Sequence, residues 1–135
     1  MRKNDGFTLI EVMIVVAIIA ILAALAIQVF PSYIVKSQVT AALADMHPGK
    51  TLVEAVIVED RDAGVVTPEY LGLTRSTHCS AVSAELSPSG AGSIVCTLIS
   101  SGTANGKDLV LRRSVDGVWT CDGGAFEVRY RPRGC

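Results

Sequence analysis

The chain has 135 residues, of which 50% are apolar and 19% charged, and 12 Lys and Arg against 13 Asp and Glu give a formal net charge of -1. Its mean hydropathy is +0.44. This length allows one modest domain, the apolar content disfavours a disordered chain, and the balanced charge disfavours a general polyanion-binding protein.

The most apolar segment lies near the N-terminus. Every residue from Val12 to Ile27 is apolar, and after Gln28 the apolar run resumes and reaches Val35. A helix needs ~20 apolar residues to cross a bilayer. A helix on a globular core would carry polar positions every three or four residues, which this run lacks until Gln28. We therefore predict a membrane-spanning helix.

Two other interpretations of this run are a cleavable secretory signal peptide and an ordinary single-span anchor. A signal peptide would use Arg2 and Lys3 as its basic start and small residues at 24–26 for cleavage. Asp5, Glu11 and the length of the run disfavour it. An ordinary anchor fits the length, but it leaves unexplained a carboxylate that costs on the order of 3 kcal/mol in hydrocarbon.

The residues before the run form a specific motif. A short polar segment, Met1–Gly6 (MRKNDG), leads into Phe7, and Glu11 stands five residues after Gly6, directly before the long apolar stretch. This constellation resembles the processing and assembly signature of type IV pilins. The resemblance implies that a prepilin peptidase cleaves between Gly6 and Phe7 and that the new N-terminal residue, Phe7, is N-methylated.

Glu11 is the predicted subunit assembly residue, together with Phe7. Cleavage would create a basic amine at Phe7, and methylation keeps it basic. As helices gather, the cation of one subunit could meet Glu11 of a neighbour, so that each buried charge is compensated in the assembled state. Breaking a buried pair commonly costs ~3 to 5 kcal/mol. The alternative is that Glu11 reaches back to the membrane surface without such a partner.

The run departs from the pilin pattern at two positions. Many relatives have glycine where this chain has Ala20, and proline where it has Gln28, whereas the proline here is Pro31. Alanine favours a helix over glycine by ~0.8 to 1.0 kcal/mol. Any unwound segment in the filament is therefore expected close to Pro31, around residues 25–30.

An amphipathic pattern follows the apolar run. Apolar residues recur at three and four residue spacings as far as Ile57, which predicts one long helix from about Phe7 to Val58. Pro48 and Gly49 interrupt the pattern, and a kink with the helix continuing is expected there. The predicted divisions are a leader at 1–6, a transmembrane or filament-core helix at 7–35, an amphipathic helix at 36–59 and a β domain at 60–135.

The remainder is predicted to be an antiparallel sheet of about four strands with one face on the amphipathic half of the helix, giving an α+β fold. Residues 60–92 are expected to be a long connection with one short element near 68–73. Short runs of β-forming residues separated by turn residues predict the strands, at 93–100, 107–113, 117–121 and 125–131.

Four cysteines, all outside the apolar run, suggest two disulfides in an oxidising compartment, and they allow three pairings. Cys79 with Cys96 and Cys121 with Cys135 are favoured because each pair closes a local loop. A bridged C-terminal loop is also similar to the one found in the pilin family. Free or metal-bound thiols are the alternative.

No catalytic or metal-binding pattern stands out. The only histidines are His47 and His78, and neither a Gly-x-Ser-x-Gly motif nor cysteine or histidine pairs with metal spacing occur. Residues 49–51 are similar to the end of a phosphate-binding loop, but Ala44 stands where that loop requires glycine. We expect no enzyme activity, no cofactor and no metal.

Three arginines alternate near the C-terminus, at Arg129, Arg131 and Arg133. In an extended strand their side chains would leave the same face. One interpretation is the solvated side of an edge strand, protected by charge against pairing with other strands. The other is a basic stripe, repeated along a filament, that binds DNA or acidic surface groups.

The resemblance as a whole implies the major structural subunit of a type IV pilus used in motility, adhesion or DNA uptake. Its partners would be identical subunits, the prepilin peptidase, the assembly machinery of the inner membrane, and DNA or a host or surface receptor. Arg2 and Lys3 would keep the leader cytoplasmic, with the soluble part periplasmic before assembly and extracellular in the filament afterwards. Alternatives are a pseudopilin or minor pilin, and an anchored periplasmic binding domain that never polymerises.

Overall fold

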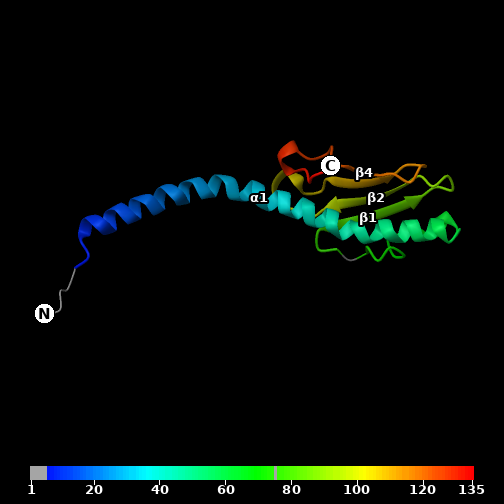
Figure 1. Cartoon of the computed structure of the whole chain (residues 1–135), viewed down its shortest axis with the longest axis horizontal. Coiled ribbons are helices and arrows are strands. Elements are labelled where there is room, and N and C mark those ends of the chain that lie inside the picture. Colours follow the sequence, from blue (N-terminus) through cyan, green and yellow to red (C-terminus); the bar gives the residue numbers. More distant parts are fainter. Residues whose placement is uncertain (1–5, 75) are drawn as a thin grey trace. The chain divides into compact units, whose positions relative to one another are not determined.

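A computed structural model describes residues 6–74 and 76–135 (Figure 1). The leader residues before Gly6, including Arg2 and Lys3, lie outside the described residues. The chain divides after Pro31 into two compact units, of which the second comprises Ser32–Cys135. Each unit is described by itself.

The helix α1 spans Leu9–Val58 and is the only α-helix of the described residues. Its bounds agree with the predicted helix to within two residues. The helix continues through both Pro31 and Pro48, as expected for Pro48. The residue after Pro48, Gly49, is buried, and a Cβ added there would lie 3.0 Å from Cδ1 of Ile94 and of Leu73. A small residue therefore lets the helix approach its neighbours closely at this point.

The part of α1 in the first unit is apolar and uncovered. Every residue from Leu9 to Phe30 is exposed. The helix contains an 18-residue window with a mean hydropathy of 3.0, none of it buried, so it is long and apolar enough to cross a membrane. Since burying apolar surface is the main favourable contribution to folding, this surface requires lipid or other chains around it.

The part of α1 in the second unit packs on the sheet through one face. Its buried residues follow each other at alternating spacings of four and three, namely Val35, Val39, Ala42, Met46, Gly49, Val53 and Val56. This period keeps them on one side of a helix. They share a hydrophobic core with inward side chains of the strands and of the C-terminal segment, including Ile94, Cys96, Leu98, Leu109, Leu111 and Phe126.

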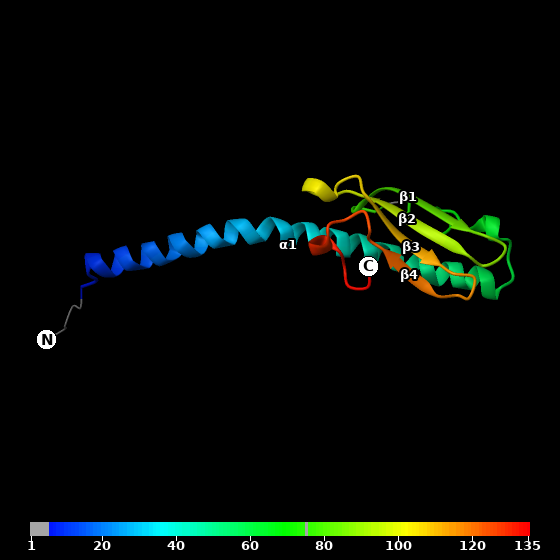
Figure 2. The same ribbon diagram turned by 90° about the horizontal axis from the view of Figure 1, so that it is seen from above.

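The sheet is a meander of four antiparallel strands in the order β1-β2-β3-β4 (Figure 2). Their bounds are Cys79–Leu86 for β1, Gly92–Leu98 for β2, Asp108–Arg113 for β3 and Trp119–Asp122 for β4. The four-stranded antiparallel sheet and the α+β class are as predicted. The predicted runs at 93–100, 107–113 and 117–121 coincide with β2, β3 and β4.

The first strand was missed by the sequence analysis, which treats residues 60–92 as a connection. Strand β1 reads CSAVSAEL, with two alanines and two serines, so it has few of the β-branched and aromatic residues that signal a strand. It pairs with β2 through registers such as Val82 with Cys96. It is one of the two edge strands and buries few of its side chains, so its pairing with β2 determines it more than its own sequence does.

The predicted strand at 125–131 is wrong. This segment contains a turn and a 3-10 helix, η3, at Val128–Tyr130. Phe126 and Tyr130 are buried, but Val128 between them is 77% exposed. The buried positions are therefore four residues apart, and the apparent alternation arises from an exposed valine.

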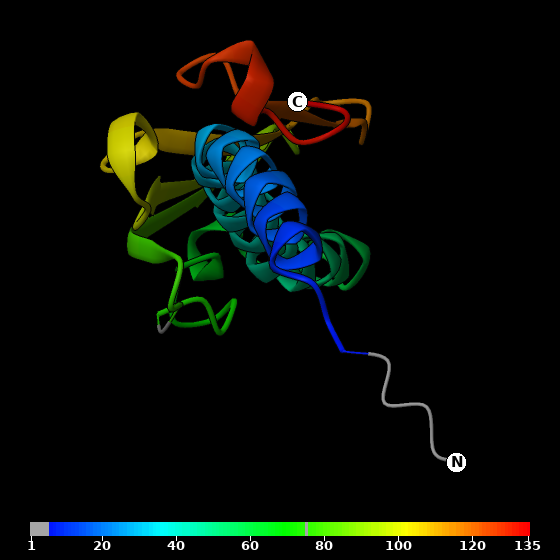
Figure 3. The same ribbon diagram turned by 90° about the vertical axis from the view of Figure 1, so that its left-hand side faces the viewer.

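Two further 3-10 helices lie in the connections, η1 at Ala63–Val65 and η2 at Gly102–Ala104. The short element expected near 68–73 is a turn, closed by the Leu73 amide donating to the Pro68 carbonyl at 2.8 Å. Figure 3, which views the chain end-on, shows η2 (yellow) and η3 (red) as separate projections.

Candidate functional site

The start of α1 is a capping box made by Thr8 and Glu11. Thr8 precedes the first helical residue, and its amide and hydroxyl each donate to Oε2 of Glu11 at 2.8 Å. The Glu11 amide in turn approaches the Thr8 hydroxyl oxygen at 3.3 Å. Reciprocal bonds of this kind satisfy amide groups that a helix leaves free at its first turn.

Sequence reasoning missed Thr8. It treats Glu11 as a carboxylate without a partner until subunits assemble, whereas Glu11 already accepts two hydrogen bonds within its own chain. The spacing Thr-x-x-Glu before an apolar run is a recognisable helix start and could have revealed this role. Phe7, directly before Thr8, is 77% exposed and lies outside the helix, as does Gly6. The Gly6–Phe7 bond thus lies outside the helix in an exposed segment.

Both disulfides of the second unit join the pairs that the sequence analysis favours. Cys79–Cys96 ties β1 to β2, and Cys121–Cys135 ties β4 to the C-terminal segment. Cys96 is fully buried, so the first bridge forms part of the core. The second bridge closes a loop with a sequence separation of 14 and fixes its end to a strand.

A second feature that sequence reasoning missed is an ion pair between α1 and β3. The guanidinium of Arg113, whose side chain is 8% exposed, donates to both oxygens of Glu54, with Nε to Oε1 at 2.7 Å and Nη2 to Oε2 at 3.0 Å. The indole of Trp119 donates to Oε1 of Glu54 at 2.6 Å. Bonds from Arg113, followed by that from Trp119, lower the pKa of Glu54 although partial burial opposes them.

The remaining bonds of Arg113 go to the backbone. Its Nη1 donates to the Gly90 carbonyl at 2.6 Å and to the Ser114 carbonyl at 3.2 Å. One side chain therefore connects α1, β3 and the turn between β1 and β2. Glu54 also raises the pKa of Arg113.

Asp45, Ser76 and His78 form a third polar group, between α1 and the start of β1. The Ser76 hydroxyl donates to Oδ2 of Asp45 at 2.7 Å, and Nδ1 of His78 lies 2.8 Å from the same oxygen. The bonds from Ser76 and then His78 lower the pKa of Asp45. The three residue types match a hydrolase triad, but serine and histidine share one carboxylate oxygen instead of forming a serine to histidine bond. Ser76 also accepts the Cys79 amide at 3.2 Å, so the group orders the entry to β1.

The extended strand that would align Arg129, Arg131 and Arg133 on one face is absent, which corrects that expectation. Because η3 replaces the expected strand, the three side chains have different surroundings. Arg129 pairs with Glu127 at 2.7 Å, and its guanidinium lies 4.8 Å from the centre of the Tyr130 ring.

Arg131 has a structural role in the same loop. Its Nε donates to the Phe126 carbonyl at 2.9 Å, and its Nη2 reaches the Gly124 carbonyl at 3.4 Å. Arg133 is exposed and lines a groove beside α1.

Among residues 6–74 and 76–135, no group of three His, Cys, Asp or Glu side chains is placed to hold a metal ion.

Comparison with known proteins identifies the family. The model of the family described as Pilin (bacterial filament) matches residues 35–135, and that of the prokaryotic N-terminal methylation motif matches residues 1–27. The chain belongs to the pilin family. The two matches lie on either side of residues 28–34 of α1, so most of the apolar run and the domain around the sheet are both covered.

Curated relatives match this pilin over its whole length. It is 36% identical to the type IV major alpha-pilin of Moraxella bovis, with 100% of this chain and 98% of that protein covered. It is 38% identical to a fimbrial protein of Pseudomonas aeruginosa, with 100% and 98% covered. It is 34% identical to the type IV major fimbrial protein FimA of Dichelobacter nodosus, with 98% and 96% covered. The resemblance inferred from the N-terminal motif is confirmed, and this pilin is a structural pilus subunit.

Proposed function

We propose that this pilin is made as a membrane-anchored precursor and polymerises through α1 as the major subunit of a type IV pilus. The observation that carries the proposal is the apolar surface of residues 9–30, which is exposed along its whole length in the single chain. A bilayer can cover it before assembly, and the same segment of other subunits can cover it in a filament core.

Processing is the first proposed step. The prepilin peptidase cleaves the Gly6–Phe7 bond, and Phe7 is then N-methylated. The exposure of Gly6 and Phe7 and their position before the helix support access by an enzyme. The division of the chain that follows is a leader at 1–6, a membrane and filament-core segment at 7–35, an amphipathic segment at 36–59, and the β domain at 60–135.

Assembly then uses Glu11 in two ways. In the monomer its carboxylate is held by Thr8. In the filament it also meets the Phe7 amine of a neighbouring subunit, which compensates the cation that cleavage creates. Since breaking a buried charge pair is costly, this contact fixes the axial register between helices.

The precursor spans the inner membrane once, with its leader in the cytoplasm, and the mature subunit is part of an extracellular filament. Both disulfides support an oxidising compartment for the second unit. The partners are identical subunits, the prepilin peptidase and the assembly machinery of the inner membrane. The filament binds DNA or a surface receptor in motility, adhesion or DNA uptake, and the subunit has no enzyme activity of its own.

Sheared surface filaments provide the test. Intact-mass and N-terminal analysis should find a chain that begins at methylated Phe7 and makes up most of the filament mass. A chain that retains Met1 in the mature protein, or that is extracted only as a monomer, would instead support an anchored periplasmic domain. A processed chain that forms only a small share of the filament would support a minor pilin or pseudopilin.

A further inference from the structure

A basic groove lies between α1 and the C-terminal loop of the second unit. Its volume is about 310 Å³, and its lining includes His47 and Lys50 from α1, Trp119 from β4, and Arg133 beside the Cys121–Cys135 bridge. None of its lining residues is Asp or Glu. Since clustered cations without a compensating carboxylate create a local positive potential, the groove suits negatively charged groups.

The charge of the groove is only partly offset by the nearby Glu54. Lys50 lies one helical turn before Glu54, and its ammonium is 5.5 Å from the centre of the Trp119 ring. Glu54 is already held by Nε and Nη2 of Arg113, so that pair is neutral as a unit, and Arg113 lowers the pKa of Glu54 more than the weaker attraction of Lys50 does. Within the described residues, neither Lys50 nor Arg133 is within 4.0 Å of a carboxylate oxygen.

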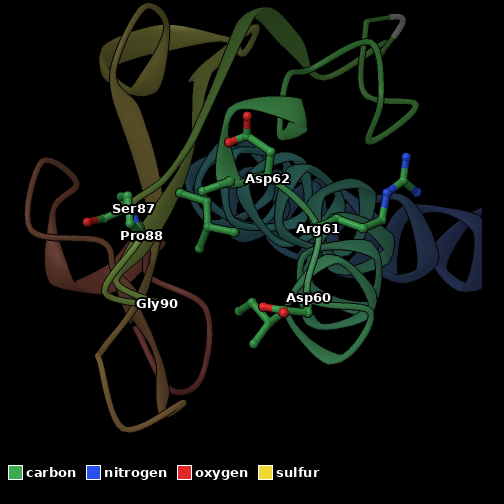
Figure 4. Close-up of a pocket in the computed structure, with 9 residues that line it drawn as sticks. Asp60, Arg61, Asp62, Ser87, Pro88 and Gly90 are labelled. Carbon is green, nitrogen blue, oxygen red and sulfur yellow. The ribbon is translucent and has the colours of Figure 1, made fainter.

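An acidic end of opposite charge follows α1, formed by Glu59, Asp60 and Asp62, all exposed. Figure 4 shows this segment facing the turn at 87–90 across a pocket of about 310 Å³, with the Arg61 guanidinium directed away from it. Arg61 lies 3.6 Å from Glu59 and stacks on Tyr70, which leaves the carboxylates of Asp60 and Asp62 without an ion pair in the described chain.

We propose that the basic groove of one subunit binds the acidic end of another copy of the same chain. This inference rests on the proposed function, because only a polymer brings the two surfaces together repeatedly. An open helical polymer needs two different, complementary patches on each subunit, since its contacts are heterologous. The basic groove and the acidic end are such a pair, and they lie at different positions along α1.

The contact sets which surfaces of neighbouring subunits meet and adds to the cohesion supplied by the apolar helices. Opposite charges favour the correct partner surface and disfavour the meeting of two like surfaces. Because these charges are exposed, the contact weakens as salt screens it, with a screening length of about 10 Å at 0.1 M and about 3 Å at 1 M.

A charge exchange in the full-length pilin tests the contact. Arg133→Glu and Asp60→Lys are each expected to lower the yield of sheared surface filaments about tenfold, because each places like charges in contact. The double variant is expected to recover most of the yield, because it restores an opposite pair in reversed order. Lys107→Glu is the control, since Lys107 is a cation of the same unit that does not line the groove and that pairs with no carboxylate in the described residues.

The amount of full-length pilin with both disulfides in the membrane fraction controls for folding. A double variant no better than the worse single variant, or normal yield in both single variants, would overturn the inference. If Arg133→Glu does not accumulate, purified wild-type and Arg133→Gln filaments are compared at low and high salt. Raising the salt should destabilise wild-type filaments more than Arg133→Gln filaments, so that the difference in stability between the two becomes smaller. Equal stability of the two kinds of filament at low salt would overturn the proposed contact. Absence of filaments from the wild-type chain would count against the proposed function instead.

Discussion

Glu11 accepts hydrogen bonds from its own chain, and the proposed assembly would add a donor from a neighbouring subunit. Thr8 holds the carboxylate at the helix start in the single chain, where both its amide and its hydroxyl are 2.8 Å from Oε2. Both of these bonds are accepted by Oε2, so Oε1 of the same carboxylate can accept a hydrogen bond from another donor. A carboxylate oriented in this way can receive the amine of an incoming subunit with little reorganisation.

Replacing Glu11 should therefore separate processing from assembly. Glu11→Ala is expected to insert and to be cleaved after Gly6, because the apolar run and the junction are unchanged, yet to yield few filaments, because the neighbouring amine loses its partner. Glu11→Asp should do partly better. Immunoblots of cleaved precursor and of sheared filaments measure the two steps, and wild-type filament yield from Glu11→Ala would show that the pairing is dispensable.

Glu54→Gln tests the ion pair that joins α1 to β3. Removing the carboxylate leaves the buried Arg113 guanidinium without its charged partner, so the free energy of unfolding should fall by roughly 2 kcal/mol. Denaturant unfolding of the full chain in detergent, followed through Trp119, the single tryptophan, measures this. Glu85→Gln is the control, because Glu85 is an exposed carboxylate on β1, and it should leave the stability unchanged.

The same variant has a pH signature. The folded pKa of Glu54 lies below its ordinary value of 4.5, so the folded state binds fewer protons than the unfolded state. The stabilisation is present above pH 4.5 and is lost as the pH falls through the lowered folded pKa. The difference between wild type and Glu54→Gln should thus shrink below pH 4.5. A difference that stays constant in acid would show that the pairing of charges is not its cause.

At the scale of elements, the sequence was most informative where a pattern was long or rich in β-branched residues. The apolar run and the three and four residue spacings predict α1 almost to its ends, and SIVCTLIS predicts β2. Strand β1 was missed because its alanines and serines carry little signal. The segment around Val128 was misassigned because alternation in seven residues cannot distinguish a strand from turns that bury every fourth side chain.

Gly49 is a position of α1 with little room for a side chain. Gly49→Val would place methyl groups against Ile94 and Leu73, where a Cβ is already at 3.0 Å, so the free energy of unfolding should fall by about 1 to 3 kcal/mol. Thr51→Val introduces the same residue at an exposed position of the same helix and should have little effect. Equal stabilities of the two variants in denaturant unfolding would show that the site expands readily.

Pro31 marks the expected weak point of the helix in the filament. The single chain is helical on both sides of Pro31, but proline removes one hydrogen bond and crowds the Ile27 carbonyl. Upstream, Ala20 favours the helix. A filament map at side-chain resolution should therefore show any unwinding at residues 25–30. Regular helix through Pro31, or unwinding centred on Ala20, would contradict this.

At the scale of the whole molecule, the C-terminal disulfide decides whether the last segment stays folded. Removing it with Cys121→Ser and Cys135→Ser should lower the free energy of unfolding by about 3 kcal/mol, given the sequence separation of 14. Amide hydrogen exchange should rise at residues 123–134 while β1 and β2 remain protected. Unchanged exchange there would show that Phe126 and Tyr130 suffice to hold the segment.

The functional residues that the sequence could predict are those whose partners lie close to them in the chain. Gly6, Phe7 and Glu11 lie within one short motif, and the cysteine pairs close local loops. The Glu54 to Arg113 pair spans 59 positions, and the basic groove gathers residues from α1, β4 and the C-terminus. Such groupings depend on tertiary packing, which a pattern within one window of sequence does not contain.

The uncovered apolar helix also sets how a filament of these subunits can grow and shrink. Lipid tails are about as apolar as leucine side chains, so moving residues 9–30 of α1 from a bilayer into a bundle of identical helices exposes little new apolar surface to water. The two environments then differ by a small free energy, and modest mechanical work could drive the transfer in either direction. The membrane would act as a reservoir, and filament length would follow the supply of stored subunits. A shortening filament could return its material to that reservoir without any subunit crossing water.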